Sequence, residues 1–397
     1  MNTGSKKRAV AVIFGSRTVE HDVSVVTAHQ VMQALLPTKY DVIPVYITRD
    51  GKWLTGEALR DLKTFQTDDL SEMLGIKETL LSPATQHHGL ITPPVAGRLG
   101  RNQVQRVDVV FPVLHGSHGE DGTLQGLLEL ADLPYVGAGV LASATVRDKV
   151  MLKAIMTAHD IPVVQHVPFS RHEWVGDPDA VLQRIESELG YPVFVKPASL
   201  GSSIGVARAD DADEARNFIN VAANFDRRLL VEKAVEDAIE INCALLGNTE
   251  LRASVLEQPI TWQEFLTYEE KYMRSEGAAG MKGAERKIPA PISDELTQRI
   301  QDMASKAFQA VDGRGTARVD FLVCEDAGEV YLNEINTIPG SLAFYLWQET
   351  GMSPTELVDE LIRLALEAAA DKRKTVYDYK TGLIAHAAAR GLKGMKK

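Results

Sequence analysis

Residues 315–340, GTARVDFLVCEDAGEVYLNEINTIPG, constrain this chain more than any other segment. They are predicted to form two strands joined by a three-residue loop at 326–328, because such hairpin loops favour glycine at their left-handed third position. That loop places Asp320 directly opposite Glu334. Side chains along a strand point alternately to the two faces of the sheet. One face of the hairpin is therefore predicted to carry Arg318, Asp320, Glu334 and Asn336.

Two carboxylates that face each other across a strand pair repel. A bound divalent cation would turn this repulsion into binding, and oxygen ligands of this kind suit Mg²⁺ carried with a nucleotide phosphate. The same register pairs Glu325 with Glu329, and it turns Val319, Phe321 and Ile335 to the other face. The alternative interpretation is a half-exposed acidic hairpin that holds no ligand.

Composition narrows the class of protein. The chain has 397 residues, which exceeds one ordinary core, so two or three domains are expected. A formal net charge of −11 argues against a nucleic-acid partner. The two cysteines, Cys243 and Cys324, have no metal or redox spacing. No apolar run approaches the ~20 residues that span a bilayer. We therefore expect a reduced, cytoplasmic protein with no membrane partner.

The N-terminal part has an alternating strand and helix pattern. Strands are predicted at 9–14, 41–48 and 107–116, and helices at 22–36 and 123–131. This order is typical of a Rossmann-like α/β layer. Residues 56–106 are irregular and are interpreted as an insertion with a short helix.

The remainder divides into two further units and a tail. Asp148, Pro178, Asp211 and Ser353 are predicted helix starts, and strands are expected at 192–197 and 227–235. Residues 372–397 carry eight Lys or Arg and one Asp, and are expected to be a loosely held basic tail. The predicted domains are 1–137, 138–232 and 233–370, followed by the tail at 371–397.

Two glycine-rich segments are predicted to bind anions. Lys196 ends a strand and precedes the loop LGSSIG at 200–205, whose backbone N–H groups and serine hydroxyls suit a phosphate-covering flap. It is not a P-loop, because a strand follows it. Lys149 could be a second phosphate contact or only a solvated lysine. The segment HGSHGEDG at 115–122 lies at a strand-to-helix turn, where N–H groups converge.

At this point the sequence resembles the D-alanine–D-alanine ligases of the ATP-grasp superfamily. The matching segments occur in the family's order and cover most of residues 9–370. They are VEHDVS (19–24), HGSHGEDGTLQGLLE (115–129), YVGAG…SATVRDKVMLK (135–153), VKPASLGSSIGV (195–206), EKAV…EIN (232–242), YEEKY (268–272), ARVDF (317–321) and NEINTIPG (333–340).

The resemblance implies a three-domain ATP-grasp fold, mixed α/β and α+β, and a role for each matching residue. Lys149, Lys196 and Ser203 would contact ATP phosphates, Glu232 and Glu240 the adenine and ribose, and Lys271 the nucleotide. Asp320, Glu334 and Asn336 would hold two Mg²⁺ or Mn²⁺ ions. Arg318 and the N–H of Gly340 would hold an oxyanion, and His115 would lie near an acyl phosphate. Glu20 would bind the ammonium of the first amino acid, linked through Ser202 and Tyr272.

The activity implied is ATP-dependent joining of two D-alanines for peptidoglycan synthesis, through a D-alanyl phosphate, in a homodimer. Tyr272 favours D-alanine over D-lactate as second substrate. Other amino-acid pairs, such as D-alanine with D-serine or D-lactate, and a nucleotide-binding regulator without catalysis stay open as alternatives.

The chain departs from the family pattern after Gly340. The family usually has Phe or Met next, and a serine five places past the glycine. Here Ser341 follows and Tyr345 occupies the serine position. Unless Ser341 takes the place of that serine, the pocket for the first amino acid is expected to differ from the pocket in the family. The turn at Gly15-Ser16 also lacks the family's second glycine.

Overall fold

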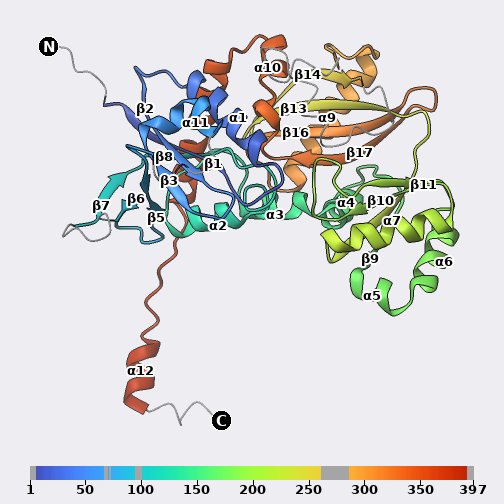
Figure 1. The fold of residues 1–397 in the computed structure, drawn as a ribbon, viewed down its shortest axis with the longest axis horizontal. Coiled ribbons are helices and arrows are strands. Elements are labelled where there is room, and N and C mark those ends of the chain that lie inside the picture. Colours follow the sequence, from blue (N-terminus) through green and yellow to red (C-terminus); the bar gives the residue numbers. More distant parts are fainter. Residues whose placement is uncertain (1–5, 67–69, 71–72, 94–100, 261–285, 391–397) are drawn as a thin grey trace.

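The computed structural model describes residues 6–66, 70, 73–93, 101–260 and 286–390. These residues form four sheets with helices packed around them (Figure 1). The mixed α/β content confirms the predicted fold class. Among the described helices, none combines the length and the apolar character required to cross a bilayer.

The N-terminal sheet has the strand order β4-β3-β2-β1-β8. The parallel strands β1 (Arg8–Gly15), β2 (Tyr40–Ile47) and β8 (Val109–Pro112) form its centre, as the alternating pattern predicts. Helices α1 (His21–Ala34), α2 (Thr123–Leu130) and α3 (Val140–Arg147) connect or follow these strands. The carboxyl ends of β1 and β8 lead into the segments that carry Glu20 and His115.

Residues 53–106 contain more strand than the sequence indicates. Strands β3 (Trp53–Thr55) and β4 (Lys77–Glu78) extend the first sheet. Strands β5 (Leu80–Leu81), β6 (Gly89–Thr92) and β7 (Gln103–Arg106) form a separate sheet. The helical part consists of two 3₁₀ turns, Glu57–Arg60 and Leu62–Gln66. The prediction of an insertion with a short helix is therefore wrong in its secondary structure, because strands of two to four residues are too short to show periodicity.

The second unit is an antiparallel sheet of order β11-β10-β12-β9. Its strands are β9 (His166–Ser170), β10 (Val193–Pro197), β11 (Ala207–Ala209) and β12 (Arg228–Lys233). Helices α5 (Arg171–Gly176), α6 (Pro178–Glu188) and α7 (Ala212–Phe225) pack on one face, where Val195, Leu229 and Val231 are fully buried. Alternation leaves Lys196 and Glu232 on the other face. Helix α4 (Lys149–Ala158) lies against that face, because its Lys153 contacts Glu232.

The third sheet has the order β15-β14-β13-β16-β17. It comprises β13 (Ile239–Gly247), β14 (Leu251–Pro259), β15 (Arg286–Lys287), β16 (Gly315–Cys324) and β17 (Glu329–Asn336). Helix α9 (Asp294–Ala310) covers the face that carries Val319, Phe321 and Ile335, all buried as predicted. The opposite face carries the predicted ligand residues.

The hairpin β16–β17 differs from its prediction at the turn. Asp320 pairs with Glu334 as predicted. Glu329 was predicted to pair with Glu325, but it pairs with Cys324. The loop has four residues, 325–328, and Gly328 has the expected positive φ of 65°. A bulge beside Asp320 absorbs one residue. The predicted three-residue loop is therefore wrong, and the bulge restores the predicted pairing at the functional end.

The C-terminal segments return to the N-terminal sheet. Ser353 forms a capping box that starts α11 (Pro354–Lys372). Leu357, Leu361 and Leu364 of α11 share one core with Val10 and Phe111 of the first sheet. Helix α10 (Phe344–Glu349) joins the same core through Trp347. Figure 1 shows α12 (Leu383–Arg390), which lies within the predicted basic tail, apart from the rest of the molecule.

Candidate active site

The predicted residues of the β16–β17 hairpin form a connected group around the buried Asp320. Arg318 donates to Asp320 through Nε and Nη2, each at 2.7 Å from a different carboxylate oxygen. The Asn336 amide nitrogen lies 2.9 Å from Asp320 Oδ2 and 3.3 Å from Glu334 Oε1. Burial raises the pKa of Asp320 to about 7. The Arg318 guanidinium opposes this change, whereas the Glu334 and Glu240 carboxylates act in the same direction as burial. An additional cation would stabilise this group of carboxylates.

Lysines converge on the hairpin from α4 and β10. Lys149 begins α4, and its Nζ donates to the Leu200 carbonyl at 2.6 Å. The same nitrogen lies 3.9 Å from Glu334 Oε2, and burial lowers the pKa of Lys149. Lys196 donates to Glu232 at 2.6 Å. Glu232 also lies 3.0 Å from the Nζ of Lys153, whose side chain is completely buried. Lys149, Lys153 and Lys196 thus form a cationic group beside the carboxylates of the hairpin.

Lys153 should determine the acid limit of stability. Burial alone would raise the pKa of Glu232, but Lys153 and Lys196 outweigh it and lower that pKa from 4.5 to about 2. A depressed carboxyl pKa contributes stability that is present above the unfolded value and lost as pH falls through about 2. In Lys153→Met, we expect a loss of about 3 kcal/mol at pH 7, because one partner of a buried ion pair is removed. Its acid unfolding midpoint should also move to higher pH.

Urea unfolding from pH 2 to 8 would measure both effects. Lys306→Met on the exposed side of α9 is the control, since it removes a lysine without a buried partner. Equal acid midpoints for Lys153→Met and wild type would contradict the assigned ion pair.

The flap and the N-terminal unit meet at Glu20. Ser202 donates a short hydrogen bond to Glu20 Oε1, which joins the glycine-serine loop to the start of α1, as predicted. Ser202 and Ser203 both have positive φ, 54° and 59°. Gly116 is required here: with φ of 77°, an added Cβ would lie 2.3 Å from Glu20 Oε2.

His115 and Glu120 lie beside the segment that follows β17. Burial lowers the pKa of the His115 imidazole, and the nearby Ile338 backbone opposes this change. Glu120 accepts from the backbone N–H groups of Gly116 at 2.7 Å and Ile338 at 3.2 Å. Burial raises the pKa of Glu120 to about 7, against the nearby Arg147 guanidinium. Glu120 is thus tied to the backbone between the hairpin and Gly340.

The Tyr345 side chain, at the position where the family has a serine, contacts strands β14 and β15. Its hydroxyl lies 2.5 Å from Glu257 Oε1, and the Arg286 guanidinium stacks 4.1 Å from the centre of its ring. The N–H of Ser341 donates to Thr27 at 3.2 Å. The Glu20 carboxylate contacts Ser202 and, at 4.0 Å, Arg147. Among the described residues, neither Tyr345 nor Ser341 is therefore hydrogen-bonded to Glu20 or Ser202.

The structure thus brings most of the predicted site residues together. The Lys149–Glu334 ion pair joins the phosphate lysines to the hairpin. On β13, Asn242 pairs with Asp320, and Glu240, two residues away, is near enough for its charge to raise the pKa of Asp320. Gly340 begins the 3₁₀ turn Gly340–Ala343 beyond the hairpin. Lys271 and Tyr272 lie outside the described residues.

Sequence reasoning missed four residues of the site, which are Thr27, Glu120, Arg147 and Lys153. Lys149 and Lys153 are spaced i, i+4 on α4, and that spacing could have predicted a shared face for Lys153. The other three are defined by contacts between distant segments and leave no local pattern.

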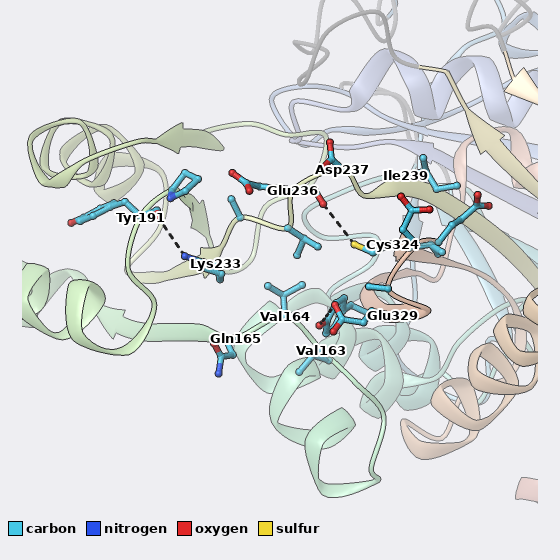
Figure 2. A pocket seen from close by; sticks show the side chains of 18 residues that line it. Val163, Val164, Gln165, Tyr191, Lys233, Glu236, Asp237, Ile239, Cys324 and Glu329 are labelled. Carbon is cyan, nitrogen blue, oxygen red and sulfur yellow. Dashed lines mark hydrogen bonds between the residues drawn. The ribbon is translucent and has the colours of Figure 1, made fainter.

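A pocket of about 720 Å³ lies beside the connection between β12 and β13 (Figure 2). Its walls are the β12–β13 connection at 233–237, the segment 163–165 and the tip of the hairpin. Hydrogen bonds from Leu332 to Pro162 and from Lys233 to Gln165 attach segment 163–165 to both sheets. Apolar side chains such as Val163, Val164 and Ile239 line it beside the exposed backbone of the connection.

The residues of the hairpin fit a divalent metal in type. Among residues 6–260 and 286–390, excluding the gaps given above, no group of three His, Cys, Asp or Glu side chains is placed to hold a metal ion alone. Asp320 and Glu334 supply two carboxylates, and the Asn336 amide can supply a third oxygen. Such an incomplete oxygen set suits Mg²⁺, which keeps water and substrate phosphate among its ligands.

Comparison with known proteins assigns the family. Residues 9–138 match the model described as the D-ala D-ala ligase N-terminus, and residues 155–363 match the D-ala D-ala ligase C-terminus. The chain belongs to the D-alanine–D-alanine ligase family. The three-domain ATP-grasp fold that the sequence resemblance implied is confirmed with it.

Similar members of the family cover nearly the whole chain. The D-alanine–D-alanine ligases of Geobacillus thermodenitrificans and Acetivibrio thermocellus are each 40% identical, over 94% of this chain and 99% of the relative. Among solved structures, the D-alanine–D-alanine ligase from Coxiella burnetii matches with a TM-score of 0.79 and 29% identity, over 97% of this chain and 99% of that one. The VanG D-Ala:D-Ser ligase from Enterococcus faecalis matches with a TM-score of 0.77 and 31% identity, over 91% and 100%.

Proposed function

We propose that the protein joins two molecules of D-alanine to D-alanyl-D-alanine, with ATP as the source of energy. The observation that carries this proposal is the convergence of Lys149, Lys196, Asp320 and Glu334 at one site in a chain 40% identical to D-alanine–D-alanine ligases over 94% of its length. The protein would work in the cytoplasm as a homodimer and supply peptidoglycan synthesis.

The chemistry requires activation of a carboxylate. A carboxylate is a poor electrophile, so ATP transfers its terminal phosphoryl group to the first D-alanine, which forms an acyl phosphate and ADP. The amine of the second D-alanine attacks the acyl carbon, the tetrahedral intermediate expels phosphate, and a peptide bond remains. The protein contributes mainly position and the neutralisation of phosphoryl charge.

Each part of the charge distribution has a use in this scheme. Lys149 and Lys196 would bind the phosphates, with the Ser202–Ser203 flap closing over them. Mg²⁺, held by Asp320, Glu334 and Asn336, would offset the negative charge of the terminal phosphates. Arg318, beside Asp320, would stabilise the oxyanion together with the N–H of Gly340.

The first D-alanine would bind beside Glu20. This carboxylate is buried, its Oε2 has no hydrogen-bond partner among the described residues, and Arg147 lies 4.0 Å from it. A substrate ammonium would supply the missing donor. Because Ser202 donates to the other oxygen, binding here would be linked to closure of the flap.

The nucleotide base would bind towards the connection between β12 and β13. Lys153 holds Glu232 in its ionised form, and Glu232 would accept from the adenine amino group. Lys233, which follows Glu232 in the chain, lines the pocket in Figure 2, and the apolar side chains of this pocket suit a purine ring.

The direct test is a screen of D- and L-amino acids with ATP and Mg²⁺, with ADP release measured enzymatically and products identified by mass. We expect ADP release that depends on D-alanine, with D-alanyl-D-alanine as the product. Turnover with L-amino acids alone would refute the proposal. ATP binding without turnover on any pair would instead indicate a nucleotide-binding regulator.

A further inference from the structure

Thr27 connects two parts of the site from a third element. It lies on α1 and is 1% exposed. Its Oγ1 accepts the backbone N–H of Ser341 at 3.2 Å and lies 3.1 Å from His115 Nε2. One buried hydroxyl therefore joins the N-terminal unit to the turn after β17.

The direction of each hydrogen bond follows from the donors available. A neutral imidazole carries one proton, and the Thr27 hydroxyl can donate to His115 Nε2 only when that proton lies on Nδ1. Burial favours the neutral imidazole, which leaves Nε2 as an acceptor. Thr27 then donates its own proton to Nε2, and its lone pair is available for the Ser341 N–H. This arrangement satisfies the Thr27 hydroxyl, His115 Nε2 and the Ser341 N–H, and it fixes the orientation of the histidine ring.

The turn that Thr27 holds has an unfavourable backbone conformation. Ser341, Leu342 and Ala343 have φ of 50°, 46° and 50°, and none is glycine. Left-handed backbone is costly for L-residues and persists where the surroundings hold it. Here the bond from Ser341 to Thr27, a 2.8 Å bond from the Leu342 N–H to the Pro339 carbonyl and the burial of Leu342 and Ala343 do so.

We propose that Thr27 is a positioning residue for the ligation reaction. Through Ser341 it holds the backbone that follows Gly340, and through His115 it reaches the side of the Ile338 backbone, which precedes Pro339-Gly340. Gly340 lies between these two points. The inference rests on the proposed function, because the position of Gly340 matters only if its N–H stabilises the reaction.

The test compares Thr27→Val, which keeps the shape and removes the hydroxyl, with Thr27→Ser, which keeps the hydroxyl. We expect Thr27→Val to lower kcat about 10- to 100-fold, since small displacements of reacting groups cost this much. KM for ATP should change less than about twofold, because the side-chain hydrogen bonds of Thr27 within the described residues go to His115 and Ser341 and to no nucleotide-binding residue. Thr27→Ser should restore kcat to within a few-fold of wild type. Thr64→Val is the control, since Thr64 is also buried and donates to a backbone carbonyl, at 2.8 Å from the Ala58 oxygen, in a 3₁₀ turn away from the site.

The outcomes separate this inference from the proposed function. A folded Thr27→Val protein with wild-type kcat would overturn the inference, as would Thr27→Ser as impaired as Thr27→Val. Thermal unfolding and ATP affinity, measured on every variant, show whether each one is folded. If Thr27→Val does not fold, Thr27→Cys replaces it, and a wild-type kcat there would likewise count against the inference. If wild type does not turn over with D-alanine, the proposed function fails, and the same comparison is made with the pair that the screen identifies.

Discussion

Replacing Glu334 with glutamine should abolish ligation while leaving the fold intact. Glu334 is a carboxylate that faces Asp320 across the hairpin and lies 3.9 Å from Lys149. Glutamine has nearly the same shape, so packing is preserved, but it removes the charge that would bind Mg²⁺. A catalytic metal contributes several kcal/mol to the transition state, so kcat should fall about 10³-fold. ADP release at saturating ATP and D-alanine would measure the loss.

Glu250→Gln is the matched control for this experiment. Glu250 lies in the turn between β13 and β14 of the same sheet and is exposed, so the substitution removes one carboxylate from a position outside the proposed site. We expect activity within a few-fold of wild type. A Glu334→Gln enzyme with normal kcat across a Mg²⁺ titration would remove the metal assignment.

Replacing Arg318 with leucine should affect both activity and stability. If Arg318 stabilises the oxyanion, the substitution costs about 3 kcal/mol or more, or over 100-fold in kcat. The structure adds a second effect, because Arg318 donates two hydrogen bonds to Asp320, which is only 2% exposed. Without its guanidinium the buried carboxylate loses its main counter-charge, and about 3 kcal/mol of folding stability should be lost.

Arg318→Lys separates the two effects. Lysine keeps a charge beside Asp320 but cannot donate in the two-bond geometry of a guanidinium. We expect most of the stability to return and most of the activity to remain lost. Full activity in Arg318→Lys would contradict a role that depends on the shape of the guanidinium, and full stability in Arg318→Leu would contradict the buried pair.

The chemistry of the hairpin could be predicted from sequence because it depends on local geometry. Alternation along a strand places Arg318 beside Asp320 without any knowledge of the rest of the fold. The loop was predicted one residue too short, and the bulge beside Asp320 compensated for that error. A bulge changes register without a sequence signal of its own, so the correct pairing at Glu334 was reached through a wrong turn.

Contacts between distant segments could not be predicted in this way. Thr27 meets Ser341 across 314 residues, and Glu120 meets Ile338 across 218. Neither threonine nor glutamate stands out in its own helix or turn. The position of Tyr345 was equally hidden, because only the folded chain shows its hydroxyl directed to Glu257, on β14. Such roles arise from packing, which leaves no periodic pattern.

The core that α11 shares with the first sheet has a consequence for synthesis of the chain. Residues 357–365 cover apolar side chains that belong to the first 111 residues. A ribosome must therefore make more than 350 residues before the earliest strands can complete their packing. Until then the emerging N-terminal segment exposes apolar surface that is prone to aggregation. A nascent chain halted before α11 should therefore depend on chaperones.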